Sequence, residues 1–386
     1  MKVFIVDISG KVINYDIALC EAINNCFAGT ENNEVVFHCP LYDEAPQCKT
    51  IRLLNLVPKR YKNGEYLWKR IIKFFELVIN YIYVIIRVAW NKPDIIHFQW
   101  FPLMEVCSGE YIAVKIMKLF SKQTRMVLTI HNVYPHNFTN KRKIIYKKRF
   151  SNVDRLMNSY VVHTEETKEV VLREFNILED RVFVIHHGVF IPKNFIPSAN
   201  IIKGNKLTFI MYGNLSDYKG VDIFVEAIKE LPESYRGKVK GVIAGAMQNK
   251  ELCQKLQDIS KDLNIEWHTY FLPEQELYER INDANVIVLP YKRISQSGVL
   301  LLALSFRRYV VTSNLAPFKE TLNGFSDDMF FESENPKSLA RLMMNYVDGR
   351  IDTERQMVII EQLNNNYSWE KAAKKTIQLY YKVVEA

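Results

Sequence analysis

The sequence predicts an α/β protein made of two doubly wound, Rossmann-like domains. Three observations support this fold class. The chain has 386 residues, which is long for one domain and comfortable for two. Short apolar, β-branched segments alternate with helical ones, as in parallel sheets whose crossovers are helices. The alternation stops in a polar stretch at residues 193–206, which contains Pro197 and Gly204, and then begins again.

The first half of the chain begins with a strand, a tight loop and a helix. Residues 3–7 are the predicted strand, the loop contains Gly10, and residues 16–26 have helical periodicity. Such a loop lies where ligands bind in an open α/β sheet. The other predicted strands of this half are residues 34–39, 95–99, 125–130, 161–164 and 182–185.

The second half repeats this alternation, and two similar halves joined by a short linker predict a cleft between them. Its predicted strands are residues 207–212, 239–244, 266–271, 286–289 and 310–312, and its predicted helices are 221–231, 250–263, 274–281 and 299–304. Residues 367–384 form a strongly helical tail with Ser368 as the expected cap.

The turn before residue 299 combines a helix cap with a glycine. Ser297 is a good N-cap, and Gly298 lets a ligand approach the backbone closely. Unpaired N–H groups and the helix dipole both favour an anion at such a helix start. The sequence leaves open the alternative of an ordinary capped helix with nothing bound.

Composition and charge limit the classes of partner and the cellular compartment that we expect for this protein. The formal charge of +8 favours anionic partners. The six cysteines lack any metal-binding spacing, and the amino terminus does not resemble a secretory signal. A cytoplasmic protein is expected, and a nucleic-acid partner is not, because no zinc, helix–turn–helix or aromatic-platform signature is present.

Residues 66–90 are strongly apolar, with Lys69, Arg70 and Lys73 near the start and Arg87 near the end. The uncharged part is too short to span a bilayer. One interpretation is a helix packed against the first sheet. The other is a helix lying on a membrane surface, which would make the protein peripheral on the inner face of the plasma membrane.

Several motifs resemble those of a known family in their order and spacing. They are Pro-Asp-Ile-Ile-His at 93–97, Thr-Ile-His-Asn-Val-Tyr-Pro-His at 129–136, Val-Ile-His-His-Gly-Val at 184–189, Tyr-Gly-Asn-Leu at 212–215 with Lys-Gly-Val at 219–221, Val-Val-Thr-Ser-Asn at 310–314, and Tyr-Ser-Trp at 367–369. Together they resemble the retaining glycosyltransferases of the GT-B fold, group 1 (family 4), across nearly the whole chain.

The resemblance implies a domain plan and an activity. Residues 1–195 would bind the acceptor, residues 196–366 would bind the donor, and residues 367–386 would form a helix packing back on the first domain. A hexosyl group would pass from a UDP- or GDP-linked sugar to a glycan or lipid-linked acceptor with retention. The nucleotide sugar is a substrate, and neither a cofactor nor a metal is expected.

Lys219 is the first candidate for catalysis and donor binding. The diphosphate leaving group gathers negative charge in the transition state, which a fixed cation stabilises. The alternative is a solvated loop lysine. Arg293 would replace the arginine that the family has where this chain has Asn214, although a surface role is as well supported. The full set of expected donor-site residues is Gly213, Asn214, Lys219, Phe271, Leu272, Tyr291, Arg293, Gln296, Ser297, Gly298 and Glu320.

On the acceptor side, the resemblance implies roles for His131, Asn132, Gly10 and Gly188. His131 ends a predicted strand, where it would contact the sugar or the acceptor, or only cap the strand. His97 sits in an apolar strand and is expected to be a core histidine, and the pair at 186–187 is expected to be structural.

The chain departs from the family pattern where two glutamates usually flank the helix near residue 299. Ile294 and Leu302 stand there instead, and Glu320 is the acidic candidate that remains. This departure supports an alternative function, a catalytically silent protein that binds sugar nucleotides on the same fold.

Overall fold

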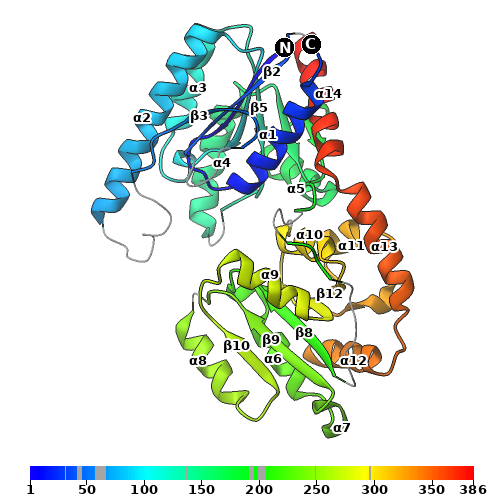
Figure 1. Ribbon diagram of the computed structural model, residues 1–386. Coiled ribbons are helices and arrows are strands. Elements are labelled where there is room, and N and C mark those ends of the chain that lie inside the picture. The colour runs from blue at the N-terminus through cyan, green and yellow to red at the C-terminus, as the bar shows by residue number, and fades with distance from the viewer. Residues whose placement is uncertain are drawn as a thin grey trace. The chain divides into compact units, whose positions relative to one another are not determined.

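The computed structural model describes residues 1–30, 32–40, 46–56, 67–135, 138–190, 195–198, 206–247, 249–294 and 297–386. The chain forms two compact units, each built around one parallel sheet (Figure 1). The first unit contains Met1–Gly188 and Trp369–Ala386, and the second contains Val189–Ser368. The prediction of two Rossmann-like α/β domains is confirmed, as is the return of the C-terminal helix to the first one.

The first unit has a seven-stranded sheet in the order β3-β2-β1-β4-β5-β6-β7. Its strands are β1 (Lys2–Asp7), β2 (Glu34–Cys39), β3 (Lys49–Arg52), β4 (Ile95–Trp100), β5 (Arg125–Thr129), β6 (Ser159–Val162) and β7 (Val182–Val184). β4 is buried along its whole length, as expected for a strand covered on both faces. The strand order reverses between β1 and β4, so the carboxyl ends of these two strands mark the usual ligand position of such a fold.

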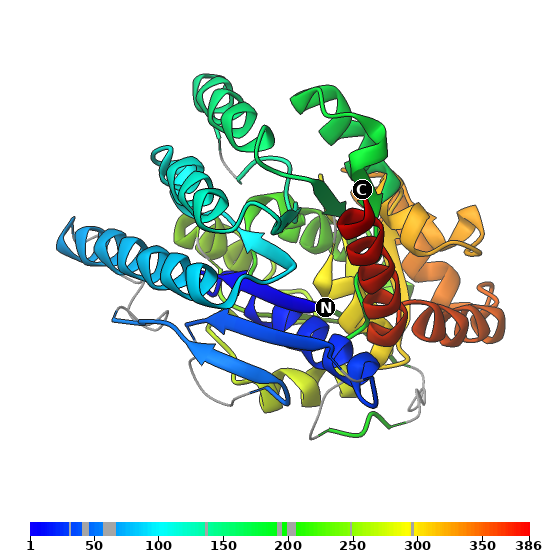
Figure 2. The same cartoon turned by 90° about the horizontal axis from the view of Figure 1, so that it is seen from above.

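Helices cover both faces of this sheet (Figures 1 and 2). The helices are α1 (Ile13–Phe27), α2 (Leu67–Asn91), α3 (Gly109–Phe120), α4 (Asn140–Asp154), α5 (Glu165–Phe175) and α14 (Trp369–Glu385). Val3 and Ile5 of β1 point to the face that α1 and α14 cover. Phe4 and Val6 point to the opposite face, under α2, α3, α4 and α5. The alternation along one strand thus supplies two cores.

The second unit has a six-stranded sheet in the order β10-β9-β8-β11-β12-β13. Its strands are β8 (Leu207–Tyr212), β9 (Val239–Ala244), β10 (Ile265–His268), β11 (Val286–Leu289), β12 (Tyr309–Ser313) and β13 (Phe330–Phe331). One face is covered by α6 (Val221–Lys229), α7 (Glu233–Arg236), α8 (Lys250–Ile259) and α12 (Pro336–Val347). The other is covered by α9 (Glu274–Asp283), α10 (Gly298–Ser305), α11 (Ala316–Thr321) and α13 (Thr353–Asn366). Here the order reverses between β8 and β11.

Some element boundaries differ from those the sequence predicted. The strand expected at 266–271 ends at His268, and the helix expected at 250–263 ends at Ile259. β3, β13, α7, α12 and α13 were not predicted from the sequence. Most of the expected linker, at 193–194 and 199–205, lies outside the described residues, as does residue 66 at the start of the apolar segment. No helix in the described ranges is both long enough and apolar enough to cross a membrane.

Candidate active site

The loop after β8 brings a lysine close to a glycine. Gly213 follows β8 with φ +104°, and a short 3₁₀ turn (Asp217–Lys219) ends at Lys219. A Cβ on Gly213 would lie 3.2 Å from Lys219 Nζ and 3.4 Å from Val299 Cγ2. A side chain at position 213 would therefore crowd both the ammonium group and the first turn of α10.

Lys219 is an unusual lysine because its side chain is largely buried, with a residue exposure of 6%. Its Nζ lies 5.2 Å from the centroid of the Tyr291 ring, a cation–π contact. No acidic side chain is recorded as an ion-pair partner of Lys219 within the described ranges. Burial lowers the pKa of Lys219 to about 8. A positive charge held in this way is poised to bind an anion.

The 3₁₀ turn is fixed to the loop after β11 by backbone contacts. Lys292 N donates to Tyr218 O at 2.8 Å. Gly220 has φ +73°, and a Cβ there would lie 1.9 Å from Pro290 O. Only glycine fits this position, and the close approach fixes Lys219 beside the carboxyl end of β11.

The start of α10 presents its backbone amides at the same edge of the sheet. Ser297 caps the helix, with its Oγ accepting from Leu300 N at 3.0 Å, as predicted. Tyr212 at the end of β8 donates to Val299 O at 2.8 Å and so fixes the first turn. Among the described residues, a Cβ on Gly298 would meet only Phe190 Cε2, at 3.9 Å.

Three of the expected donor-site residues, Gly213, Lys219 and Gly298, therefore lie in one region. They follow β8 and β11, the strands between which the order reverses. A buried ammonium group next to a helix N-terminus suits a phosphate or a diphosphate.

Two more of the expected donor-site residues belong to this region, Tyr291 through its contact with Lys219 and Ser297 through the cap of α10. The others differ in exposure. Phe271 is highly exposed and Leu272 is buried in the core under α9. Asn214 and Arg293 are exposed, and Gln296 lies outside the described residues. Phe318 of α11 packs on Tyr291, with ring centroids 5.5 Å apart, which puts the helix that carries Glu320 next to the ring beneath Lys219. Ile294 and Leu302 both pack against the apolar core of this face.

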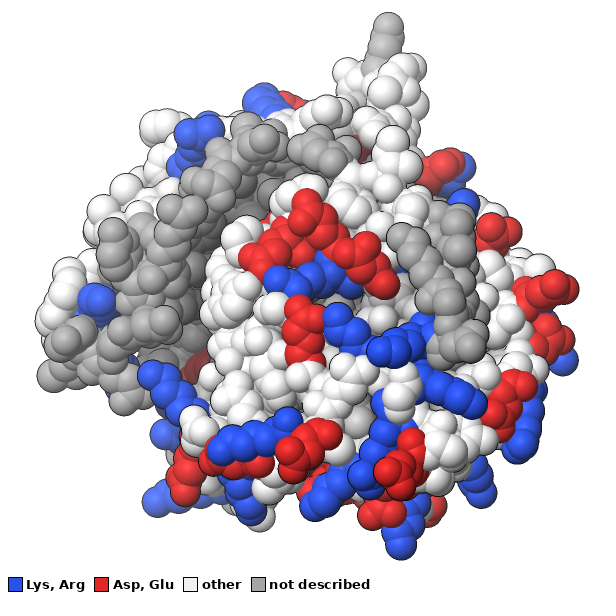
Figure 3. All heavy atoms as spheres, turned by 60° about the horizontal axis from the view of Figure 1, so that its bottom comes forward, with Lys and Arg blue, Asp and Glu red and all other residues white. Residues whose placement is uncertain are grey.

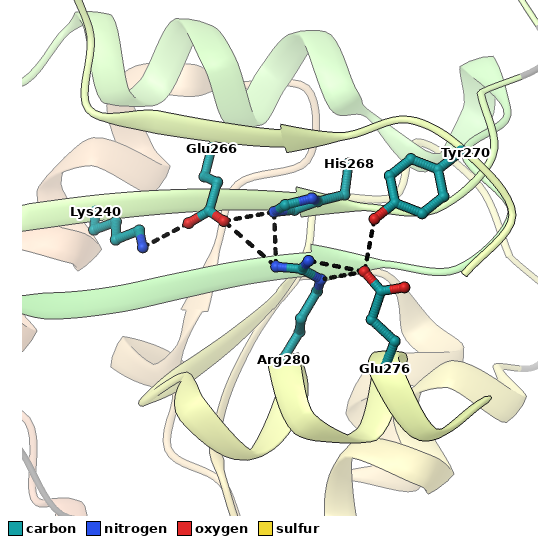
Figure 4. Close-up of polar contacts among 6 residues, drawn as sticks. All are labelled: Lys240, Glu266, His268, Tyr270, Glu276 and Arg280. Atoms are coloured by element: carbon teal, nitrogen blue, oxygen red, sulfur yellow. Dashed lines mark hydrogen bonds and ion pairs between the residues drawn. The ribbon is translucent and has the colours of Figure 1, made fainter. Parts of the chain in front are cut away.

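A polar network that the sequence analysis missed lies next to Phe271, at the edge strand β10 (Figure 4). Glu266 Oε2 pairs with Lys240 Nζ at 2.6 Å, and Arg280 Nη1 reaches His268 Nε2 at 2.8 Å. The Lys240 hydrogen bond is the main reason that the pKa of Glu266 falls to about 2. Glu266 Oε1 also lies 2.6 Å from His268 Nε2 and 3.4 Å from Arg280 Nη1. Glu276 contacts Arg280 and Tyr270, at 2.8 and 2.6 Å. The network joins β9, β10 and α9 and so supports the loop at 269–273.

In the first unit, the loop after β1 is shaped by a buried aspartate. Asp7 Oδ1 accepts from Ser9 N and Gly10 N, both at 2.9 Å. Gly10 adopts φ +62° at the expected position. The next residue, Lys11, lies over the Trp100 ring with Nζ 3.9 Å from its centroid, and it pairs with Glu105 at 2.9 Å.

His131 lies two residues after the end of β5, and its neighbours fix the position of its proton. His163 Nδ1 lies 2.9 Å from Ile185 O, which can only accept, so His163 carries its proton on Nδ1. Burial lowers the pKa of His163 to about 4, so its Nε2 is an acceptor toward His131 Nδ1 at 3.2 Å. Burial, followed by the nearby histidines, lowers the pKa of His131 well below its usual range. A neutral His131 therefore keeps a lone pair on Nε2.

A small pocket lies beside this histidine at the carboxyl ends of β4 and β5. His131, Asn132, Trp100 and Glu105 line it. His131 Nε2 and Trp100 Nε1 are buried and have no hydrogen-bond partner within the described residues. Buried polar atoms are usually paired, so each of these two atoms is a candidate to bind a polar group of a ligand in this pocket.

His97 and His187 have structural roles, as expected from the sequence. The two ring nitrogens of His97 lie 2.6 Å from Tyr380 Oη and 2.7 Å from Thr129 Oγ1. His187 Nδ1 lies 2.6 Å from Gly188 O. A Cβ on Gly188 would lie 2.5 Å from the Trp369 ring, so packing against α14 explains the glycine. Within the described ranges, no three His, Cys, Asp or Glu side chains are grouped to hold a metal ion.

Two protein-family models match adjoining parts of the chain. The model described as glycosyl transferases group 1 matches residues 192–363. The model described as glycosyltransferase family 4 matches residues 28–191. Together they span most of the chain.

Curated relatives have low identity to this chain. A GDP-mannose:glycolipid 4-beta-D-mannosyltransferase from Xanthomonas campestris pv. campestris is 23% identical over 272 residues, covering 67% of this chain and 72% of that protein. A D-inositol 3-phosphate glycosyltransferase from Corynebacterium urealyticum is 21% identical over 327 residues, covering 79% and 71%.

Solved structures resemble the chain over almost its whole length. A glycosyltransferase from Rickettsia africae has a TM-score of 0.70 at 16% identity and covers 99% of this chain and 98% of its own. HepE from Anabaena, in complex with UDP and glucose, has a TM-score of 0.69 at 12% identity, with coverage of 99% and 100%. At these identities the likeness is one of fold.

Proposed function

The chain belongs to the glycosyltransferases of group 1 (family 4), with the two Rossmann-like domains of the GT-B fold, and on that premise we propose that it transfers a hexosyl group from a UDP- or GDP-linked sugar to a glycan or lipid-linked acceptor. One observation carries the proposal: Lys219 Nζ, Gly213 and the start of α10 lie together at the carboxyl ends of β8 and β11.

The chemistry of the donor explains why this arrangement suits the reaction. Breaking the bond to the sugar leaves a nucleoside diphosphate that gains negative charge in the transition state. Lys219 and the N–H groups of Gly298 and Val299 would stabilise that charge before the bond breaks, because they are already in place. Burial of the lysine strengthens the interaction with the diphosphate, since little water screens it.

On the acceptor side, His131 would accept a hydrogen bond from a sugar hydroxyl through Nε2. Its low pKa makes it a poor proton carrier at neutral pH. The proton of the attacking hydroxyl would therefore pass to the leaving phosphate oxygen, and we propose retention of anomeric configuration. The name of the Xanthomonas relative specifies a β linkage, so the product anomer is the feature to measure. Proton NMR of the product reports it, and an inverted product would overturn retention but not transfer.

A second candidate function is the binding of sugar nucleotides without catalysis. The apolar side chains of Ile294 and Leu302, where relatives often carry glutamates, favour it. Both functions suit the cytoplasm, because that compartment contains nucleotide sugars.

A nucleotide panel separates these functions. We expect UDP or GDP to raise the melting temperature, because a ligand that binds only the folded state stabilises it by mass action. The corresponding nucleotide sugar should then be hydrolysed or transferred. Stabilisation without turnover would favour the silent protein, and the absence of stabilisation by UDP, GDP and ADP would overturn both.

A further inference from the structure

One face of helix α2 packs into the core of the first unit. Leu77, Tyr81, Val84 and Val88 are buried against the sheet. The helix also carries one acidic residue, Glu76, which is buried and accepts from Leu56 N at 2.7 Å. Packing and hydrogen bonding thus account for this side of the helix.

The opposite face of α2 is apolar and exposed. Its side chains follow one another at intervals of three or four residues and therefore lie on one side of the helix. They are Trp68, Ile71, Phe75, Ile79, Ile82, Ile86 and Trp90, and each is 41–80% exposed. At 1.5 Å per residue the stripe is about 33 Å long. Contiguous apolar patches of this size mark interaction sites on soluble proteins.

The two helices that follow α2 in the same layer extend this surface. α3 packs on α2, and α4 packs on α3. α3 exposes Ile112, Leu119 and Phe120. α4 exposes Ile144 and Ile145, with exposed Lys141 and Lys148 at helical spacing on the same side. We call the outer surface of these three helices the α2–α4 face.

Charge on the three helices is almost entirely positive. Their acidic residues are Glu76, Glu110 and Asp154. The first two are buried, and Asp154 pairs with Arg181 at 3.0 Å. Their basic residues are Lys69, Arg70, Lys73, Arg87, Lys115, Lys118, Lys141, Arg142, Lys143, Lys147, Lys148 and Arg149. By contrast, acidic and basic side chains are interspersed on the face drawn in Figure 3.

We propose that the α2–α4 face docks on the surface of a membrane that contains anionic lipids. A long apolar stripe flanked by cations is the pattern of a helix that lies in the lipid interface. Basic residues near an anionic leaflet add attraction within a Debye length. A second copy of the chain is a poorer occupant, because two such faces would bring like charges together.

The inference deepens the proposed function, because it puts the enzyme where a lipid-linked acceptor would be. Only this link to the acceptor rests on the proposed function. The evidence for docking is the α2–α4 face itself, and it would hold equally for a protein without transferase activity.

Vesicle flotation tests the docking. We expect the full chain to bind vesicles of 70% phosphatidylcholine and 30% phosphatidylglycerol at least tenfold more tightly than vesicles of pure phosphatidylcholine, and less tightly as salt rises. Ile79→Glu with Ile82→Glu should weaken binding to the mixed vesicles at least tenfold, because charge enters the apolar stripe. Lys141→Glu with Lys148→Glu should remove most of the preference for anionic lipid.

The matched control is Tyr381→Glu with Val384→Glu, on the exposed side of α14, which covers the opposite face of the same sheet. It should bind like the unchanged protein. All variants should keep the melting temperature and the nucleotide-induced stabilisation of the unchanged chain, which separates docking from folding and from the proposed function. Equal binding by the α2 variant and the control would overturn the proposal. So would a dimer, measured by light scattering, that Ile79→Glu with Ile82→Glu dissociates while no vesicles bind.

Discussion

At the scale of single residues, Lys219 is the main evidence for the donor site. Its burial favours the neutral amine, while an anionic ligand favours the ammonium form. We expect Lys219→Met to lower the transfer rate by about 10²–10³, the cost of losing one preorganised donor of charge stabilisation. Lys255→Met, at an exposed position of α8, is the control and should keep full activity. Steady-state assays with the identified donor would measure both, and equal rates for the two variants would contradict the assignment.

The same lysine predicts a pH dependence of nucleotide binding. With a pKa of about 8, Lys219 is mostly protonated at pH 7 and mostly neutral at pH 9. Nucleotide affinity should therefore fall roughly tenfold over that interval, because only the protonated form attracts the diphosphate. Calorimetric titration at each pH measures this change. In Lys219→Met the affinity should be weak and almost independent of pH, whereas Lys255→Met should follow the unchanged protein.

The histidines near β5 show what single-residue reasoning from sequence misses. The end of a strand predicted the position of His131. Its protonation state depends on His163 and Ile185, which are distant in sequence and meet it only through the order of β5, β6 and β7. No local pattern carries that information, and so the sequence left the role of this histidine open.

At the scale of elements, α2 and α3 are joined by a buried carboxyl group. Glu110 accepts hydrogen bonds from Leu103 N and, at 3.3 Å, from Tyr81 Oη. Burial raises the pKa of Glu110 to about 8, whereas an unfolded glutamate titrates near 4.3. The folded state thus holds a proton that the unfolded state has released. Stability is greatest below the unfolded pKa and is lost as pH rises toward 8.

Glu110→Gln removes this titration and keeps an oxygen that can accept from Leu103 N. We expect its free energy of unfolding, relative to the unchanged protein, to rise by up to about 1.4 kcal/mol per pH unit between pH 5 and 8. Urea unfolding at several pH values measures the difference. Parallel stability curves for Glu110→Gln and the unchanged protein would contradict the assignment.

Elements also show where sequence patterns succeed and where they fail. The convergence of Lys219 and Gly298 was predictable, because both follow parallel strands and such strands end at one edge of a sheet. The network around Arg280 was not, since it joins β9, β10 and α9. The start of α12 carried a usable signal that was overlooked, Asn335 as cap followed by Pro336. For α2, apolar residues all round the helix could not indicate which face is buried.

At the scale of the whole molecule, the first unit depends on the last helix of the chain. Tyr380 of α14 is fully buried, and its hydroxyl group lies 2.6 Å from His97 Nδ1 in β4. Tyr380→Phe should cost about 1–3 kcal/mol of unfolding free energy, because a buried ring nitrogen loses its partner. Chemical denaturation monitors this loss. Tyr381→Phe, one residue along at a partly exposed position, should change stability by less than about 0.5 kcal/mol, and similar losses in both variants would argue against a specific role for the buried contact.

Because α14 belongs to the first unit, this unit cannot be completed until the whole chain has been synthesised. The ribosome makes the amino-terminal strands and α1 first, but α14, which shares with α1 the cover of Val3 and Ile5, is made last. All of Val189–Ser368 must be synthesised in between, which at about 5–20 residues per second takes on the order of ten seconds or more. During that interval the apolar surface that α14 will cover, on α1 and this face of the sheet, is exposed, and chaperones have reason to bind the nascent chain there.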